Sequence, residues 1–438
     1  MTYTSISDLY ELYINCHQKI TTDTRKLENG SIFFALKGDN FDANTFVQSA
    51  INGGCSYAIT DNEQYANGNT ILLVKNVLEA LQQLAKYHRR KLQIPVIGIT
   101  GSNGKTTNKE LISAVLSKKY KVYATKGNLN NHIGVPLTLL AITPLHEMAI
   151  VEMGANHQGE IELLSDLADP NYGIITNIGK AHLEGFGGIE GIKKGKSELY
   201  KHLRNKKGTV FINGNDEVLM ELASGITKMS YGEDEAFDVH GKLFSNSEYV
   251  EFKWNIKGNT VNDKPLVKTK MFGHYNFINM VCAAAIGHYF KVTESDINAA
   301  LAEYSPEMNR SQVLKTERNT LILDAYNANP TSMGLAIHNF SGQHFSKSLI
   351  ILGDMLELGE YSENEHENTL NQLVSLKVEE AWLVGDLFLQ FEKDYPSYHF
   401  FKDTEKAILH LQKHPVGDKT VLIKGSRGIR LEKIVNFL

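Results

Sequence analysis

Cysteine is scarce in this sequence, and the usual signals of secretion or membrane insertion are missing. Only Cys16, Cys55 and Cys282 occur in 438 residues, widely spaced and without a Cys-x-x-Cys pair. This excludes a disulfide framework and a thiolate metal site, and it predicts inert thiols in a reducing compartment. The opening residues, MTYTSISDLYELY, lack a basic segment followed by an apolar run, and no window approaches 18 uninterrupted apolar residues. We therefore expect a cytoplasmic protein without stable membrane association.

Blocks of like charge are absent as well. The formal net charge is -5 and the Lys and Arg residues are scattered, so nothing indicates a surface for nucleic acid or anionic lipid. With 42% hydrophobic and 22% charged residues, the composition is that of an ordinary globular protein. A chain of 438 residues exceeds what one hydrophobic core normally organises. We expect two or three domains, compact soluble substrates and a monomer, although no motif sets the oligomeric state.

The hydrophobic pattern changes twice along the chain. Residues 1–92 contain short strand candidates and then an amphipathic helix at 77–91, which indicates a small α/β unit; the strands lie at 31–36, 57–60 and 71–74. From residue 94, strand and helix candidates alternate, as is typical of a mostly parallel sheet covered on both faces. Residues 237–270 indicate antiparallel strands, and residues 274–290 read as a buried helix.

Alternation restarts after the break at Ser305-Pro306, with strand candidates that each precede a helical segment; they lie at 321–327, 349–355, 381–386 and 420–426. This predicts a third, Rossmann-like unit of ordinary domain size. The predicted fold is therefore α/β with three domains: a small N-terminal α/β domain (1–92), a central P-loop mononucleotide-binding domain built on a parallel sheet (93–306), and a C-terminal Rossmann-like domain (307–438).

A glycine-rich loop, GITGSNGKTT at residues 98–107, follows the apolar run at 94–97. Backbone N–H groups at a helix start, one ammonium and hydroxyls suited to Mg²⁺ form a phosphate cradle. The general P-loop pattern has glycine where this chain has Ile99, so the match is to a variant with the first glycine at Gly98; an ordinary turn is the alternative. The predicted phosphate-binding residues are Gly101, Ser102, Asn103, Gly104, Lys105, Thr106 and Thr107.

Two candidate metal ligands follow strands of the same predicted sheet. Glu152 ends the apolar strand 148–151, and a carboxylate at the carboxyl end of a parallel strand faces the crevice where phosphates bind. Taken singly, it is as well explained as a helix-capping or salt-bridging acid. His182 follows the strand at 172–179, and an isolated histidine there is most often structural. Together with Glu152 beside a P-loop, metal ligation becomes the favoured interpretation.

Lys196 occupies an unusual position in the predicted helix at 188–203. It recurs at helical spacing with Ile192, Leu199 and Leu203, so its side chain should point inward. A snorkelling lysine is the usual explanation for such a position. Desolvation, however, favours the neutral amine, which can add carbon dioxide to give a metal-binding carbamate. The residues by themselves leave both explanations open.

Taken together, the segments TGSNGKTT, VEMGANHQGEI, NIGKAHLEGFG, KSELY, HYNFIN and DAYNANPTSM appear in the order found in the Mur ligases. The chain thus resembles, over nearly its whole length, this family of ATP-dependent amide-forming enzymes of peptidoglycan precursor synthesis. Four further segments resemble the members that join D-alanyl-D-alanine to UDP-N-acetylmuramoyl-tripeptide: NLNNHIGVPLTLL, YNANP at 326–330, GDMLELGE and LIKGSRG. Members that add a single amino acid carry a different segment where YNANP stands.

The resemblance implies roles for individual residues. Lys105 would hold the β- and γ-phosphates of ATP, Thr106 and Glu152 one Mg²⁺, and His182 with carbamylated Lys196 a second, so that Lys105, Glu152, His182 and Lys196 would be catalytic. Further implied contacts are Asn276 and Asn279 with adenine, Arg310 and Asp324 near the nucleotide, Thr24 and Arg25 with the uridine diphosphate end, Asn130 and Asn131 with the muramoyl side, and Tyr326 and Asn327 with substrate. The family often has His-Asn where this chain has Tyr275-Asn276, which leaves the contact of residue 275 open.

The implied reaction forms an acyl phosphate and ADP, after which the dipeptide amine displaces phosphate. Lys105 and Mg²⁺ would neutralise the developing charge, and the third domain would swing onto the central one.

A sister ligase using another amino acid, or a folylpolyglutamate-type synthetase, is the nearest alternative. From a different class, the chain could be a P-loop kinase or a nucleotide-gated binding protein. Neither function explains the third domain or the presence of Glu152, His182 and Lys196. No motif tells whether the third residue of the tripeptide is diaminopimelate or lysine.

Overall fold

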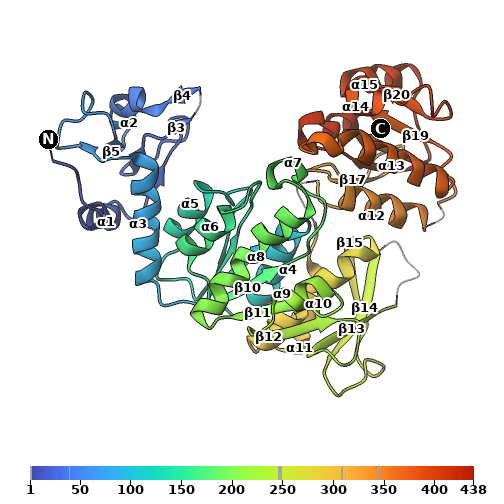
Figure 1. Ribbon diagram of the computed structural model, residues 1–438, viewed down its shortest axis with the longest axis horizontal. Coiled ribbons are helices and arrows are strands. Elements are labelled where there is room, and N and C mark those ends of the chain that lie inside the picture. Colours follow the sequence, from blue (N-terminus) through green and yellow to red (C-terminus); the bar gives the residue numbers. More distant parts are fainter. Residues whose placement is uncertain (1, 39, 245–248, 307–308, 344) are drawn as a thin grey trace.

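The computed structural model describes residues 2–38, 40–244, 249–306, 309–343 and 345–438, whose strands form three main sheets and one small ribbon. Figure 1 shows the three sheets in successive parts of the chain, with the N-terminal part beside one end of the central part and the C-terminal part beside the other. Among the described residues, none of the helices combines the length and the apolar composition needed to cross a membrane.

The N-terminal part contains a four-stranded parallel sheet. Its strands, in spatial order, are β1 (Ile20–Thr21), β2 (Ile32–Phe34), β5 (Tyr57–Thr60) and β6 (Ile71–Leu73). The remaining elements are the ribbon β3 (Lys37–Gly38) with β4 (Phe41–Asp42) and the helices α1 (Ile6–Asn15), η1 (Ala43–Phe46), α2 (Val47–Asn52) and α3 (Val77–Lys91). The strand segments predicted near 31–36, 57–60 and 71–74 are confirmed.

Helix α3 connects this sheet to the central part. Asn76 caps it by accepting a hydrogen bond from the Glu79 N–H at 2.9 Å, and basic residues fill its last turn, where they complement the helix dipole. Its apolar face, which includes Leu81 and Leu84, is buried and packs against α5 (Gly134–Leu140) and α6 (Glu160–Ala168) of the central part. Because α3 follows the N-terminal sheet and packs against the central part, it fixes the position of that sheet relative to the central part.

The central part is built on a nine-stranded sheet. Its spatial order is β15 (Val267–Phe272), β14 (Tyr249–Ile256), β13 (Val239–Leu243), β12 (Thr227–Gly232), β11 (Thr209–Asn213), β10 (Tyr172–Ile175), β7 (Val96–Thr100), β9 (Met148–Glu152) and β8 (Val122–Ala124). All neighbours from β8 to β13 pair in parallel, and β13, β14 and β15 pair antiparallel, as predicted for residues 237–270. Strand β12 was not predicted, because its sequence TKMSYG carries few apolar residues.

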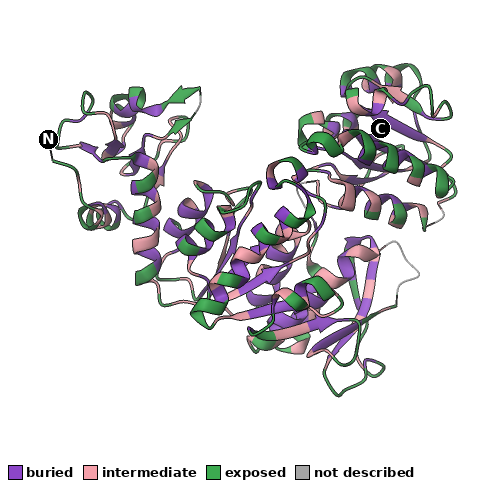
Figure 2. Ribbon diagram, viewed as in Figure 1, coloured by how far each residue is buried: buried purple, intermediate pink, exposed green. Residues whose placement is uncertain are grey.

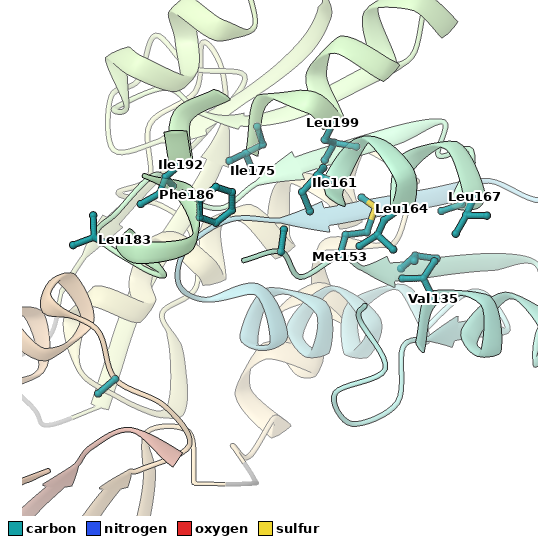
Figure 3. Close-up of a cluster of buried hydrophobic side chains, with 14 of the residues drawn as sticks. Val135, Met153, Ile161, Leu164, Leu167, Ile175, Leu183, Phe186, Ile192 and Leu199 are labelled. Atoms are coloured by element: carbon teal, nitrogen blue, oxygen red, sulfur yellow. The ribbon is translucent and has the colours of Figure 1, made fainter. Parts of the chain in front are cut away.

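Helices cover both faces of this sheet, and Figure 2 shows many of its strands in the colour of buried residues. This cover explains why β7 and β9 are buried along their whole length. One face packs against α5, α6, α7 (Leu183–Phe186) and α8 (Ile189–Lys206), and Figure 3 shows the apolar side chains between them. The other face packs against α4 (Lys105–Leu116), α10 (Phe277–Tyr289) and α11 (Glu294–Glu303). Two short helices complete this part, α9 (Glu217–Leu222) and η2 (His274–Asn276).

The C-terminal part contains a six-stranded sheet in the order β16 (Gln312–Lys315), β17 (Thr320–Asp324), β21 (Thr420–Lys424), β18 (Ser348–Gly353), β19 (Ala381–Val384) and β20 (His399–Phe401). Only β16 runs antiparallel to its neighbour. Its helices are α12 (Pro330–Ser341), η3 (Gly359–Tyr361), α13 (Ser362–Ser375), α14 (Asp386–Leu389), α15 (Thr404–Lys413), η4 (Arg427–Ile429) and η5 (Leu431–Phe437). The α/β fold class is confirmed. The predicted boundary at 306/307 adjoins residues 307 and 308, which lie outside the described residues.

Candidate active site

A cavity of about 620 Å³ lies between the carboxyl edge of the central sheet and the C-terminal part. Sixteen of the residues singled out from the sequence line it: Ser102, Asn103, Gly104, Lys105, Thr106, Thr107, Asn130, Asn131, Glu152, His182, Asn276, Asn279, Arg310, Asp324, Tyr326 and Asn327. Gly101, Lys196, Thr24 and Arg25 are not among its lining residues. Segments that are more than 200 residues apart in sequence are thus brought together at one cavity.

The glycine-rich loop connects β7 to α4 at this cavity. Gly101 has φ of +140°, and a Cβ there would lie 1.9 Å from Thr176 Oγ1, so only glycine fits. Helix α4 has no side-chain cap, which leaves its first backbone N–H groups available for an anion. Lys105 Nζ donates to the carbonyls of Gly101 at 2.7 Å and Ser102 at 3.1 Å. Burial lowers the pKa of Lys105 to about 8, although the charge of Glu152 opposes this shift.

The loop is held by the segment that follows β10. Ser102 Oγ donates to the Gly179 carbonyl at 2.9 Å, and the Asn103 N–H donates to Asn177 Oδ1 at 3.0 Å. Thr176 Oγ1 donates to the Asn103 carbonyl at 2.6 Å. Sequence reasoning missed Thr176 and Asn177 as positioning residues, although they stand in the segment that leads to His182. Each bond replaces a contact with water that the loop would otherwise make, so the cradle is shaped before any ligand binds.

Glu152 is almost fully buried at the end of β9. Its Oε1 accepts from Asn130 Nδ2 at 2.8 Å, whereas the buried Oε2 finds no hydrogen-bond partner among the residues that the structure describes, with Lys109 Nζ at 3.9 Å. A carboxylate oxygen in this state fits a hard cation, because it lacks the partner that burial normally demands. Within the described part of the chain, no group of three or more His, Cys, Asp and Glu side chains is arranged to hold a metal.

His182 lies in the left-handed region, with φ of +54°, and lines the cavity. Its Nδ1 is 2.5 Å from Oε2 of Glu357, which belongs to the C-terminal part. Among the described residues, Nδ1 makes no hydrogen bond of aligned geometry, so this contact is a close approach of the carboxylate to the ring nitrogen. Pairing with His182 lowers the pKa of Glu357. Sequence reasoning placed His182 at the cavity but did not find its partner.

Lys196 points inward, as its spacing predicted, and only 1% of the residue is exposed. Its Nζ donates to the Ala155 carbonyl at 3.1 Å and lies 4.9 Å from the centre of the Phe186 ring. Burial lowers the pKa of Lys196 well below its usual value, and the charge of Lys105 lowers it further. The residue is thus a buried lysine and not a snorkelling one. Lys196 does not line the cavity itself, but its hydrogen-bond partner Ala155 does.

The two predicted adenine-side asparagines form a chain of hydrogen bonds. Asn108 Nδ2 donates to Asn279 Oδ1 at 2.8 Å, and Asn279 Nδ2 donates to Asn276 Oδ1 at 3.0 Å. Asn276 Nδ2 in turn donates to the Phe272 carbonyl at 2.9 Å. This chain links α4 to the start of α10 and fixes which way each amide faces. Asn108, directly after the glycine-rich loop, was missed by sequence reasoning.

Arg310 and Asp324 reach the cavity from the C-terminal part. The Arg310 guanidinium carbon lies 3.7 Å from the centre of the Tyr326 ring, and its buried Nε has no hydrogen-bond partner within the described part of the chain. Asp324 accepts hydrogen bonds from Lys424 Nζ at 2.5 Å and from the Ser311 N–H at 3.2 Å. The guanidinium is therefore held by stacking on Tyr326, while Asp324 is already paired.

Tyr275 stands where the family often has histidine. Its hydroxyl lies 2.7 Å from Ser311 Oγ, and burial raises its pKa. The tyrosine thus joins the start of α10 to the C-terminal part through a neutral hydrogen bond. Tyr275 also lines the cavity, so this contact adds a protein partner and leaves the ligand contact of residue 275 a prediction.

Further contacts join the central and C-terminal parts around the cavity. Asn329 Nδ2 donates to Asn103 Oδ1 at 2.7 Å, and the Lys180 N–H donates to Thr331 Oγ1 at 3.0 Å. Lys180 Nζ also pairs with Glu365 Oε1 at 2.5 Å. The two parts are therefore docked against each other through side chains next to the glycine-rich loop and next to His182.

Thr24 and Arg25 lie in the N-terminal part. The Arg25 side chain is 87% exposed and binds Asp23 through two nitrogens, each at 2.9 Å. This pairing lowers the pKa of Asp23 to about 2. The segment thus presents an exposed, oriented guanidinium away from the cavity, and a ligand that contacts both places must extend between the N-terminal and central parts.

Comparison with known proteins places these features in a family. The family models described as the Mur ligase middle domain and as the Mur ligase, glutamate ligase domain match residues 99–287 and 309–427. The chain is 37% identical over 433 residues to the UDP-N-acetylmuramoyl-tripeptide--D-alanyl-D-alanine ligase of Bacillus subtilis (strain 168), with 96% of this chain and 92% of that protein covered. The ligase of the same name from Escherichia coli (strain K12) is 33% identical over 431 residues, with 96% and 93% covered.

Solved structures agree with these matches. A crystal structure of MurF from Acinetobacter baumannii has a TM-score of 0.86 at 33% identity and covers 95% of this chain and 92% of that one. Folylpolyglutamate synthase from Mycobacterium tuberculosis, with a TM-score of 0.62 and 13% identity over 82% of this chain and 94% of that one, shares the fold alone. The two family matches and the relatives that align over nearly the whole chain show that this protein belongs to the Mur ligase family.

Proposed function

We propose that this chain joins D-alanyl-D-alanine to UDP-N-acetylmuramoyl-tripeptide with hydrolysis of ATP to ADP and phosphate, which yields the UDP-N-acetylmuramoyl-pentapeptide. One observation carries the proposal. A single cavity collects the glycine-rich loop and Glu152 from the central part with Tyr326 and Asn327 from the C-terminal part. The names of relatives that are 31–37% identical over most of the chain support this choice of substrates over those of sister ligases.

ATP binding is assigned to residues 101–107 together with Asn276, Asn279, Arg310 and Asp324. The N–H groups at the start of α4 and the Lys105 ammonium would hold the β- and γ-phosphates. Lys105 now bonds to its own loop, so phosphates would replace the Gly101 and Ser102 carbonyls as its partners. Arg310, which lines the same cavity, would contribute its guanidinium to the nucleotide.

Mg²⁺ is proposed at Thr106 and Glu152, with a second ion at His182 and carbamylated Lys196. Glu152 Oε2, which has no hydrogen-bond partner among the described residues, supports the first assignment. The lowered pKa of buried Lys196 favours the neutral amine and so supports its carbamylation. When bound, the metal supplies positive charge that offsets the repulsion between the carboxylate substrate and the triphosphate. The unmodified Lys196 ammonium would repel a cation instead.

The reaction begins when the terminal carboxylate of the tripeptide attacks the γ-phosphorus of ATP. A carboxylate oxygen of the tripeptide forms a bond to the γ-phosphorus, and the bond from the γ-phosphorus to the β–γ bridging oxygen breaks. The products are ADP and an acyl phosphate. Lys105 stabilises the charge on the transferred group, a contribution typically worth several kcal/mol. The neutral amine of D-alanyl-D-alanine then attacks the acyl carbon, phosphate leaves, and the amine proton passes to solvent or phosphate.

A division of labour among three domains follows from this scheme. Residues 1–92 would bind the uridine diphosphate end through Thr24 and Arg25, with the diphosphate replacing Asp23 as the partner of the Arg25 guanidinium fork. Residues 93–306 would bind ATP and, through Asn130 and Asn131, the muramoyl side. Residues 307–438 would bind the dipeptide and close on ATP. We further propose a monomeric enzyme that works in the cytoplasm, where UDP-linked precursors and ATP are available.

ADP release measured by a coupled assay tests the function. We expect release only when a UDP-N-acetylmuramoyl-tripeptide and D-alanyl-D-alanine are both present, and assays with diaminopimelate- and lysine-containing tripeptides identify the third residue. Single amino acids, and a folate with glutamate, serve as the acceptor controls. ADP release that needs only a free amino acid would overturn the proposal in favour of a sister ligase.

A further inference from the structure

The segment GDMLELGE at residues 353–360 has no role in the proposed reaction, yet it carries a carboxylate to His182. The segment follows β18 of the C-terminal sheet, and His182 immediately precedes α7 of the central part. Glu357 Oε2 and His182 Nδ1 are 2.5 Å apart. Glu357 of the C-terminal part therefore contacts the ring of His182, which belongs to the central part and lines the cavity.

The backbone on both sides of this contact is constrained. His182 and Glu357 have φ values of +54° and +64°, a region that non-glycine residues adopt only when their surroundings require it. The Glu184 N–H donates to the Glu357 carbonyl at 3.4 Å. Gly359, with φ of +54°, comes so close to Glu184 that a Cβ there would lie 3.1 Å from its side chain. The loop is thus fitted to α7 over several residues.

We propose that Glu357 is a positioning residue for His182, and that docking of the C-terminal part completes the site for a divalent cation. When the Nδ1–H donates to this carboxylate, the pair selects the tautomer that leaves the Nε2 lone pair free and holds the ring plane. His182 lines the same cavity as Glu152, whose buried Oε2 has no hydrogen-bond partner in the described ranges of the chain. Docking of the C-terminal part then raises the affinity for the cation, and binding of the cation favours docking to the same extent. The inference rests on the proposed function, which makes His182 a metal ligand.

Binding of Mn²⁺ to the full chain tests the inference, with a non-hydrolysable ATP analogue present and free Mn²⁺ measured by electron paramagnetic resonance. Glu357→Ala should weaken the tight Mn²⁺ sites by roughly 10- to 100-fold, the usual effect of losing such a partner. Glu360→Ala, an exposed carboxylate in the same loop, is the matched control and should change the affinity less than about twofold. Equal Mn²⁺ affinity in Glu357→Ala and the unmodified chain would overturn the inference.

Two further variants separate a positioning role from a simple contact between domains. In a His182→Ala background, Glu357→Ala should have no additional effect on Mn²⁺ affinity, because its action passes through the ring. Glu365→Gln removes the charge that pairs with Lys180 without touching His182, and it should weaken Mn²⁺ binding while X-ray scattering shows a more open molecule. Opening of Glu365→Gln with unchanged Mn²⁺ affinity would disprove the link between docking and the cation.

These measurements use no cell-wall substrate, so their result is independent of which acceptor the enzyme uses. If ADP release identifies a different acceptor, the Mn²⁺ results for Glu357→Ala still stand. If His182→Ala alone leaves Mn²⁺ affinity unchanged, the assignment of His182 as a metal ligand fails, and the role of Glu357 fails with it.

Discussion

Asn329 Nδ2 donates a hydrogen bond to Asn103 Oδ1 at 2.7 Å and so joins the start of α12 to the glycine-rich loop. The same side chain caps α12, because its Oδ1 accepts from the Ser332 N–H at 3.0 Å in a capping box. One residue therefore serves both the local stability of a helix and the contact between two parts of the chain.

Asn329→Ser should separate these two roles. Serine is a good helix cap but is too short to reach Asn103, so stability should be kept while affinity for an ATP analogue falls by about fivefold, the value of one lost hydrogen bond. Asn329→Ala should show the same loss of affinity and destabilise the C-terminal part by about 1 kcal/mol more. Calorimetric titration and urea unfolding measure the two effects. A serine variant that binds the nucleotide normally would show that the contact with Asn103 is unimportant.

Substitutions of Lys196 test its proposed carbamylation. Lys196→Ala should lower turnover by roughly 10²- to 10³-fold while most of the nucleotide affinity remains. Lys196→Arg should fail too, because a guanidinium keeps its charge and does not form a carbamate. Adding a short carboxylic acid to Lys196→Ala should restore part of the activity. Near-normal turnover of Lys196→Arg would reduce this residue to a buried structural lysine.

The pair of Lys424 with Asp324 should be important for stability. Lys424 is 2% exposed and Asp324 18% exposed, so removal of the lysine leaves a carboxylate largely shielded from water. Lys424→Met should destabilise the C-terminal part by about 3 kcal/mol. Lys433→Met, at an exposed position, is the control and should stay within about 0.5 kcal/mol of the unmodified chain. Equal unfolding midpoints for the two variants would contradict this expectation.

His88 should make stability depend on pH where α3 meets the central part. Its Nε2 donates to the Ile142 carbonyl at 2.8 Å, and burial lowers its pKa. Well above about pH 6.5 the ring is neutral in both the folded and the unfolded chain, so it does not make the free energy of unfolding depend on pH. Below this value the unfolded chain binds the proton first, so the free energy of unfolding falls as the pH decreases. Urea unfolding between about pH 7.5 and about pH 5 should show a steeper loss for the unmodified chain than for His88→Phe.

Much of the site could be predicted because its signals are local. The glycine-rich loop lies between β7 and α4, and both the φ of Gly101 and the free N–H groups of α4 follow from a few neighbouring residues. The alternation of strands and helices predicted a parallel sheet, and parallel strands bring their carboxyl ends to one edge, where Glu152 and His182 both line the cavity. Helical spacing placed Lys196 inside the protein, and it is buried.

What only the tertiary structure decided concerns the partners of these residues. Strands β12, β16 and β20 escaped prediction because short or polar strands are recognised mainly by the neighbours with which they pair. Sequence spacing likewise held no information on the pairing of His182 with Glu357 or on the position of Lys196 one layer behind the cavity. Periodicity reports which face of an element is buried, whereas the contacts between elements depend on how separate domains pack together.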